Sequence, residues 1–400
     1  MSLLVILSLL GWLYLAVFHG AFWRPLVAGV VPDPAAWPSV DIIVPARNEA
    51  ASLPQSLPTL LAQDYAGAWR VVLVDDHSED GTADVARGLA AKLGRADRLT
   101  VMAAPELPVG WVGKVAAMQA GVAQSRADYI LFTDADIAHD AGSLRRLVAR
   151  AVARNLDLTS LMVKLNCVSV AEKLLIPAFV FFFGMLYPFR RANDPDSRVA
   201  AAAGGVMLVR RRALDNAGGL AAIRSALIDD CSLAKIIKRG GGDFSANGRI
   251  ELTLAETVKS LRPYPVLADV WHMVARSAYT QLNHSVLWLV GAVLGLGLLF
   301  FMPIVALLGG NLFAAAAGMM AWVVMSLLYA PMISFYGLPW YWVLTLPFVS
   351  ALYIGATADS ARRHAIGKGG QWRGREAASQ MRLAEVIMRE DKNVLKKLAD

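Results

Sequence analysis

The sequence predicts an α/β fold with a Rossmann-like, mostly parallel sheet and helices on both faces, together with N-terminal and C-terminal transmembrane helices. Two observations predict it. Short β-rich runs alternate with helical patterns between about residues 40 and 165, which is typical of βαβ units. Long apolar stretches flank this region, and 56% of the 400 residues are hydrophobic, more than in an ordinary soluble enzyme. We therefore expect a membrane-attached protein.

The alternating elements can be placed in order along the chain. Each apolar run is short enough for a buried strand, and each is followed by a stretch with helical spacing of its apolar residues. Strands are expected at Val40–Val44, Trp69–Val74, Leu99–Met102, Tyr129–Thr133 and Leu158–Leu165, with helices ending near Leu61 and spanning about Thr82–Leu93, Lys114–Ser125 and Ala141–Arg154.

The first apolar segment, residues 1–23, is expected to be an uncleaved transmembrane anchor. It lacks a basic start and an obvious small-residue cleavage site, both of which a signal peptide would have. Arg24 follows it directly, and the positive-inside rule then puts the next domain in the cytoplasm. We expect a bacterial inner membrane protein with a cytoplasmic catalytic domain.

The second apolar block, residues 286–358, has room for three helices of about 20 residues each. Three full spans would carry the basic tail to the far side of the membrane, which the positive-inside rule disfavours. Either one segment is re-entrant or the tail breaks the rule. The remaining expected parts are a catalytic domain at 38–265 with an interfacial helix at 171–189, an interfacial connection at 266–285 and a membrane-proximal tail at 361–400.

The formal net charge of +7 does not indicate nucleic acid, because no RNA-binding aromatic motif or zinc-finger spacing accompanies it. Ten Lys and Arg and five Asp and Glu fall within residues 361–400, so the tail is expected to bind anionic lipid. The two cysteines, Cys167 and Cys231, fit a reducing compartment. No protein partner can be named from the sequence.

Two carboxylates, Asp134 and Asp136, directly follow the expected strand Tyr129–Thr133. Residues i and i+2 of a strand point to the same side. Such a pair can share one Mg²⁺ or Mn²⁺ ion, which commonly completes its ligand shell with substrate phosphates. The spacing alone is more often that of a solvated turn, so the neighbouring motifs decide the interpretation.

Polar residues also follow two other expected strands. In a parallel sheet, ligands bind beyond the carboxyl ends of the strands, so these motifs are expected to line one crevice with Asp134. Carboxylates at 75 and 76 could accept the imide N–H of uracil, although Ser78 to Thr82 also make an ordinary turn and helix start. The residues concerned are Pro45, Arg47 and Glu49 after the first strand, and Asp75 and Asp76 after the second.

Together these motifs resemble those of the family 2 inverting glycosyltransferases, which have the GT-A fold. The resemblance covers about residues 41–240 and includes Gly113-Lys114. It implies that Pro45 to Glu49 and Asp76 hold the nucleotide, that Lys114 lies near its phosphates, and that the metal on Asp134 and Asp136 neutralises the departing diphosphate. Without the family context, Lys114 would be an exposed lysine at a helix start.

An inverting transfer needs a base, and the resemblance assigns this role to Asp230, with Asp229 beside it. Two adjacent acids in a partly buried cleft raise one pKa by repulsion, which suits a base. The pair also resembles an ordinary acidic helix start, and both interpretations can hold together. Many family members have Glu or Thr at the first position.

A closer resemblance is to the hopene-associated membrane glycosyltransferases. It depends on Gly110-Trp111-Val112-Gly113-Lys114, on residues 171–180, and on Ala226 to Asp230. It implies a UDP-sugar donor and a hopanoid acceptor. Met273-Val274-Ala275-Arg276 keeps only the arginine of the Gln-x-x-Arg-Trp motif of processive members, so polymer synthesis is not expected, and Arg276 is a candidate contact to the diphosphate.

Other functions remain open at this point. Polyprenyl phosphate or a ceramide-like lipid could replace the hopanoid as acceptor. A non-catalytic nucleotide-binding membrane scaffold is a different class, and the joint presence of Asp76, Asp134, Asp136 and Asp230 argues against it. The tail motif Gln371 to Arg375 resembles those of related membrane glycosyltransferases, or is a basic interfacial segment with a Trp anchor.

Overall fold

The structure is a computed structural model that describes residues 1–240, 248–366, 371–372 and 375–376. The chain divides into two compact units. Of the described residues, the sheet unit comprises those within Val31–Thr159, Ala203–Gly248 and Gly370–Asp400, and the helical unit comprises those within Met1–Val30, Ser160–Ala202 and Arg249–Gly369.

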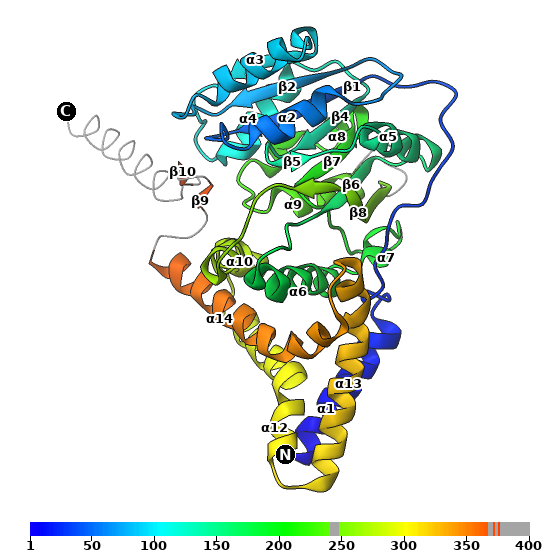
Figure 1. Ribbon diagram of the computed structural model, residues 1–400, viewed down its shortest axis with the longest axis vertical. Helices are drawn as coiled ribbons and strands as arrows, with labels where there is room; N and C mark the ends of the chain where they lie inside the picture. Colours follow the sequence, from blue (N-terminus) through cyan, green and yellow to red (C-terminus); the bar gives the residue numbers. More distant parts are fainter. Residues whose placement is uncertain (241–247, 367–370, 373–374, 377–400) are drawn as a thin grey trace, which may run out of the picture. The chain divides into compact units, whose positions relative to one another are not determined.

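The sheet unit contains the predicted α/β fold (Figure 1). Its five principal strands are in the order β3-β2-β1-β4-β7. The first four are parallel and β7 is antiparallel to β4, which confirms the mostly parallel sheet. Their bounds are β1 Val40–Ala46, β2 Trp69–Asp75, β3 Leu99–Ala103, β4 Tyr129–Thr133 and β7 Val206–Arg210, and the short β5 is Ile137–Ala138.

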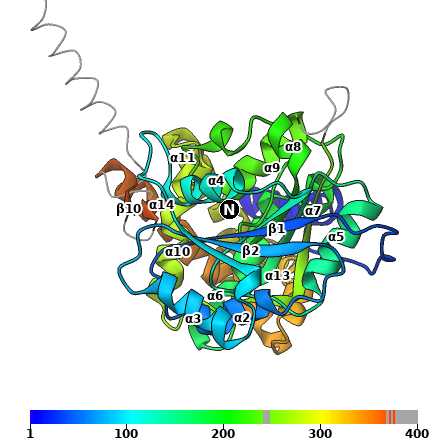
Figure 2. The same ribbon diagram turned by 90° about the horizontal axis from the view of Figure 1, so that it is seen from above.

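Helices cover both faces of this sheet, with α4 on one face of β1 and β2 and with α2 and α3 on the other (Figure 2). Gly121 of α4 lies so close to Ile43 and Val74 that a Cβ atom there would be 2.6 Å from Ile43. The fully apolar centres of β1 and β2 therefore pack between two helix layers. The helices are α2 Leu53–Leu61, α3 Thr82–Lys92, α4 Gly113–Ala123, α5 Ser143–Ala153, α8 Arg211–Asn216 and α9 Asp229–Gly240.

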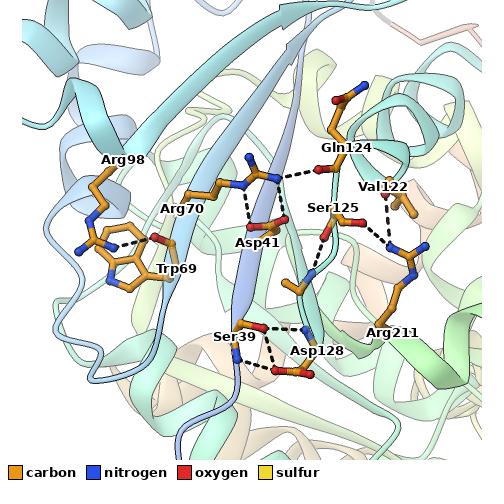
Figure 3. A network of polar contacts seen from close by, with 11 residues as sticks. Ser39, Asp41, Trp69, Arg70, Arg98, Val122, Gln124, Ser125, Asp128 and Arg211 are labelled. Carbon is orange, nitrogen blue, oxygen red and sulfur yellow. Dashed lines mark hydrogen bonds and ion pairs between the residues drawn. The ribbon is translucent and has the colours of Figure 1, made fainter.

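Polar contacts fix the amino ends of the strands, at the opposite end from the predicted site (Figure 3). The Arg70 guanidinium binds both carboxylate oxygens of Asp41, at 2.9 and 3.1 Å. The Asp128 carboxylate accepts from the backbone N–H and the hydroxyl of Ser39, at 2.8 and 2.7 Å. Bidentate and charge-assisted bonds of this kind are the stronger hydrogen bonds in proteins, so they fix the alignment of β1, β2 and β4.

The helical unit holds three helices that are long and apolar enough to cross a membrane, at Val286–Leu308, Leu312–Phe335 and Trp340–Ala365. They confirm three apolar helices in the C-terminal region. The N-terminal helix has 17 residues, the lower end of the length that spans a bilayer, and its role as an anchor stays a prediction. The elements are α1 Ser2–Phe18, α6 Val170–Leu186, α7 Phe189–Ala192, β8 Ile250–Ser260, α10 Leu267–Gln281, α11 Val286–Leu296, η3 Gly297–Phe301, α12 Met302–Leu308, α13 Leu312–Phe335, η4 Trp340–Thr345 and α14 Leu346–Ala365, while β6 Leu158–Lys164 begins in the sheet unit and continues into this one.

A π-helical turn, η3, joins α11 to α12. The carbonyl oxygen of Leu299 in this turn accepts hydrogen bonds from Ser8 Oγ at 3.1 Å and Trp12 Nε1 at 2.8 Å, both from α1. In an apolar environment each backbone polar group must find a partner inside the protein. The N-terminal helix therefore binds the C-terminal helices through specific hydrogen bonds, and it also contacts α13 (Figure 1).

Candidate active site

The carboxyl end of β4 carries the two predicted metal ligands. Asp134 and Asp136 are both partly exposed, and Ala135 between them is buried. This alternation agrees with the expectation that the two carboxylates lie on one side of the chain.

Lys114, in the first turn of α4, lies among the predicted site carboxylates. Its Nζ is 3.0 Å from Asp134 Oδ1 and 3.2 Å from Asp229 Oδ2. Burial alone would lower the pKa of Lys114, but Asp134, Asp229 and Asp230 together hold it well above its usual range. Lys114 is thus a permanently charged ammonium that connects the end of β4 to the start of α9.

Asp230 is fixed by two backbone N–H groups. Its Oδ2 accepts from Gly204 at 2.8 Å and its Oδ1 accepts from Cys231 at 2.7 Å. Burial and the neighbouring Asp229 raise the pKa of Asp230 to about 6, against the opposite effects of Lys114 and the two N–H donors. A carboxylate with a pKa near neutrality can accept a proton and release it again.

Gly204 allows its backbone to approach this carboxylate. A Cβ atom at position 204 would lie 3.3 Å from both Asp230 Oδ2 and Lys114 Nζ, closer than an ordinary van der Waals contact. A residue with a side chain would therefore crowd both charged groups.

A buried network behind the end of β4 was not predicted from the sequence. His139 Nε2 is 3.0 Å from Thr133 Oγ1, and His139 Nδ1 is 3.1 Å from Ser143 Oγ. Thr133 Oγ1 donates to the carbonyl of Gly205 at 2.9 Å, and Ser143 Oγ lies 3.1 Å from Gln63 Oε1. Burial lowers the pKa of His139 to about 4, so its imidazole is neutral at pH 7. The network connects α2, β4, α5 and the 203–205 segment, which places Asp134 and Asp230 relative to one another.

The residues predicted to bind the nucleotide lie after β1 and β2. Arg47 Nη1 donates to the backbone carbonyl of Asp76 at 2.5 Å and is 3.8 Å from its carboxylate. Asp76 is 2% exposed, whereas Asp75 is partly exposed and accepts from the Ser78 N–H at 3.1 Å. The structure therefore brings Arg47, Asp75 and Asp76 together, with Asp75 the more accessible carboxylate.

Of the two other residues predicted to follow the first strand, Pro45 differs from the expectation and Glu49 lies after the strand. Pro45 lies within the strand, because β1 continues its parallel pairing with β2 up to Ala46. Its missing N–H is tolerated since the pairing of β1 with β4 ends at Ile43. The backbone N–H of Glu49 donates to Thr82 Oγ1 at 2.9 Å, and its carboxylate accepts from Ser52 Oγ at 2.7 Å, so Glu49 connects the starts of α2 and α3.

Arg276 lies in α10 of the helical unit and is exposed. Its predicted contact to the diphosphate stays a prediction. The tail motif at residues 371–375 lies partly outside the described residues, and the rest of the tail beyond 376 lies outside them entirely. Gln371–Trp372 and Arg375–Glu376 pair as two short antiparallel strands, β9 and β10.

The donor atoms at the end of β4 fit a divalent cation. Asp134 and Asp136 supply hard oxygen ligands, which Mg²⁺ and Mn²⁺ prefer. Among the residues that the structure describes, no group of three His, Cys, Asp or Glu is placed to hold a metal ion. Two carboxylates supply only part of the ligand shell of such an ion.

The comparison with family models matches one stretch of the chain. Residues 41–218 match the model described as glycosyl transferase family 2. The matched stretch covers a little under half of the chain and is similar to the glycosyltransferases of family 2. The matched family is the one that the ordered motifs resemble, and the match agrees with the expectation of a glycosyltransferase enzyme.

Relatives with curated names match part of this chain. An undecaprenyl-phosphate 4-deoxy-4-formamido-L-arabinose transferase of Pseudomonas aeruginosa is 34% identical over 28% of this chain and 32% of its own length. A dodecaprenyl-phosphate galacturonate synthase of Rhizobium johnstonii is 32% identical over 32% of this chain and 36% of its own. An N-acetylglucosaminyltransferase of Mesorhizobium japonicum is 36% identical over 28% and 25%. The matches thus span only about a quarter to a third of the relatives.

A solved structure resembles the chain over most of its length. The mannosyltransferase PcManGT from Pyrobaculum calidifontis, in complex with GDP-Man and Mn²⁺, has a TM-score of 0.58 and 20% identity, over 92% of this chain and 99% of that chain. At this identity the likeness concerns the fold, and it confirms the predicted GT-A-type architecture.

Proposed function

We propose that the protein transfers a sugar, with inversion, from a nucleotide-sugar donor to a hydroxyl group of a membrane lipid. The observation that carries this is Asp230, a carboxylate with a pKa raised to about 6 that is held by two backbone N–H groups beside Lys114 and Asp134. The three apolar helices of the helical unit support a lipid as the acceptor.

The proposed reaction is a single displacement. Asp230 removes the proton of the acceptor hydroxyl while the hydroxyl oxygen attacks the anomeric carbon. The bond from that carbon to the diphosphate oxygen breaks, and the nucleoside diphosphate leaves with the electron pair. Lys114 stabilises the negative charge that develops on the diphosphate. Hydrogen bonds to both oxygens of Asp230 fix its orientation during the transfer.

Asp134 and Asp136 would hold the Mg²⁺ or Mn²⁺ ion, which supplies Lewis-acid stabilisation of the diphosphate when bound. Arg47, Asp75 and Asp76 would bind the nucleoside, in keeping with their common position after β1 and β2. UDP is favoured as the nucleotide by the family resemblance. We further propose that Pro45 and Glu49 hold this segment in place and that Arg276 meets the diphosphate.

The acceptor that we favour is a hopanoid or a similar polycyclic lipid in a bacterial inner membrane, with the sheet unit in the cytoplasm. The motifs shared with the hopene-associated glycosyltransferases support it, and an alcohol acceptor also needs the base that Asp230 provides. We propose that residues 171–189 form an interfacial helix and residues 361–400 a membrane-proximal basic segment.

A polyprenyl phosphate is the second candidate acceptor. The names of two relatives, an undecaprenyl-phosphate transferase and a dodecaprenyl-phosphate synthase, favour it. A phosphate oxygen is already negatively charged and needs no comparable base. The two acceptors therefore differ in what they require of Asp230.

Nucleotide release separates these possibilities. Purified full-length protein is mixed with a panel of UDP-sugars, Mg²⁺ or Mn²⁺, and either a polycyclic triterpene alcohol or undecaprenyl phosphate. We expect UDP release with the alcohol, and a loss of about 10²-fold or more in Asp230→Asn. Turnover with undecaprenyl phosphate that persists in Asp230→Asn would favour the second candidate. No turnover and no UDP binding with any donor would favour a non-catalytic scaffold.

A further inference from the structure

Three polar side chains of α13 end inside the helical unit without a hydrogen-bond partner. They are Trp322, Ser326 and Tyr329, whose Nε1, Oγ and hydroxyl atoms are buried and unpartnered among the described residues. All the buried, unpartnered side-chain polar atoms found in the described part of the helical unit lie on this one helix.

The three side chains lie on one face of α13. Their spacing of four and then three residues corresponds to about one and two helical turns, and the row is about 10 Å long at the rise of an α-helix. Tyr329 is 0% exposed and Ser326 is 8% exposed. Tyr329 also packs edge-to-face against Phe181 of α6, with ring centroids 5.1 Å apart, so this part of the row is held in place.

Neighbouring polar side chains of the same unit do find partners. The hydroxyl of Tyr353 donates to the carbonyl of Leu175 at 2.8 Å, and Ser350 Oγ donates to the carbonyl of Pro347 at 2.6 Å. Ser8 and Trp12 share the Leu299 carbonyl. Polar side chains on the other helices thus have hydrogen-bond partners. A buried polar group without a partner lowers the free energy of unfolding by about 1–3 kcal/mol. The α13 row is a systematic exception.

We propose that this row binds the oxygen-bearing group of an uncharged lipid alcohol. The indole N–H is only a donor, and the two hydroxyls can donate or accept, so the row suits oxygen atoms of a ligand. Residues 312–335 contain no Lys, Arg, Asp or Glu, and a phosphate placed against them would be an uncompensated charge in an apolar region. A hydroxyl lipid fits this chemistry better than a phosphorylated one.

This inference relies on the proposed function in one respect, namely that the lipid is an acceptor, which the row holds before the lipid hydroxyl reacts at Asp230. The binding itself needs no donor and no metal, so it can be measured separately from turnover. If UDP release fails while lipid binding succeeds, only the proposed function is wrong.

The test measures the thermal midpoint of the full-length protein in detergent while a pentacyclic triterpene alcohol is added. The parent hydrocarbon and undecaprenyl phosphate serve as comparison lipids. We expect the alcohol to raise the midpoint with a saturable concentration dependence and the hydrocarbon to have no effect. In the double variant Ser326→Ala/Tyr329→Phe, the alcohol concentration that gives half of the shift should rise by about tenfold or more. Tyr341→Phe changes an exposed tyrosine and is the control, in which this concentration should stay the same.

The double variant remains informative even without lipid, because deleting unpartnered hydroxyls should leave its midpoint equal to or above that of the wild type. An equal response of wild type and double variant to the alcohol would overturn the proposal, as would equal responses to alcohol and hydrocarbon. A stronger response to undecaprenyl phosphate would overturn the uncharged class. No response to any lipid would mean that the row holds only buried water.

Discussion

One ammonium among three carboxylates determines the electrostatics of the candidate site. Lys114 lies 3.0 Å from Asp134 and 3.2 Å from Asp229, and its charge also lowers the pKa of Asp230. Deprotonated Asp230 is needed as a base, so turnover should fall as the pH drops through about 6. The acidic limb of the pH profile therefore reports on this residue.

Replacing Lys114 should move that limb. In Lys114→Met the pKa of Asp230 rises, because the cation that favours its charged form is lost, and an opposite charge at short range shifts a pKa by about 1–3 units. We expect the acidic limb of kcat to move to higher pH and the maximal rate to fall. Lys92→Met, an exposed lysine at the end of α3, is the control. An unmoved limb would show that Lys114 does not influence the base.

At the scale of the element, the end of β4 depends on the buried histidine network. His139→Ala removes two buried hydrogen bonds, to Thr133 and Ser143. At about 0.5–1.5 kcal/mol for each bond, the free energy of unfolding should fall by about 1–3 kcal/mol. The same substitution should also weaken metal binding, because Thr133 directly precedes Asp134. We expect a lower affinity for Mn²⁺ in His139→Ala and a partial recovery of that affinity in His139→Gln. Electron paramagnetic resonance of Mn²⁺ measures the affinity. His272→Ala, an exposed histidine of α10, should change neither quantity, and an unchanged Mn²⁺ affinity in His139→Ala would contradict the positioning role.

The start of α6 depends on Glu172. Its carboxylate accepts from the N–H groups of Val168 and Ser169, each at 2.8 Å, and of Tyr264 at 2.7 Å, which completes a capping box with Ser169. Burial would raise the pKa of Glu172, but these donors hold it below its usual value.

A depressed carboxyl pKa stabilises the fold above the unfolded-state pKa, and this contribution is lost as the pH falls through the folded-state pKa. Glu172→Gln should therefore lower the thermal midpoint at pH 7 and have a smaller effect below about pH 4. Thermal melts in detergent at both pH values measure it. Glu256→Gln, at an exposed position of β8, is the matched control. An equal loss at both pH values would mean that the carboxylate charge is not the cause.

At the scale of the whole molecule, metal binding should depend on the nucleotide. Two protein carboxylates leave most of the ligand shell of Mn²⁺ to water and phosphates. We expect the apparent Kd of Mn²⁺ to fall by about tenfold or more when UDP is present, and Asp136→Asn to remove this gain.

Removal of metal with EDTA should abolish UDP release, and added Mn²⁺ should restore it. Turnover that survives EDTA would contradict the assignment.

The sequence predicted the alternation of strands and helices well, because buried parallel strands read as apolar runs. It placed the end of β1 two residues early, since Pro45 suggests a turn and the pairing with β2 is not visible in the chain itself. Asp134, Lys114, Asp229 and Asp230 were predicted as site residues, and the structure brings them together.

The supporting residues could not be predicted in the same way. His139 contacts Gln63 only through Ser143, across about 80 residues of sequence, and no local pattern records such a path. Gly204 belongs to the run Ala203-Gly204-Gly205, which resembles the hopene-associated glycosyltransferases, but the sequence does not show that its N–H binds Asp230. The α13 row at positions 322, 326 and 329 was visible as a spacing, but its lack of partners depends on the packing of the whole unit.

Gly204 offers a way to stop the reaction without removing a charge. Its backbone N–H holds the proposed base, and one methyl group at this position would press on Asp230 and Lys114 together. Gly204→Ala would thus behave like a covalently attached inhibitor the size of a single carbon atom. Such a variant, with every ionisable group retained, would be suited to trapping donor and lipid in one complex for structure determination.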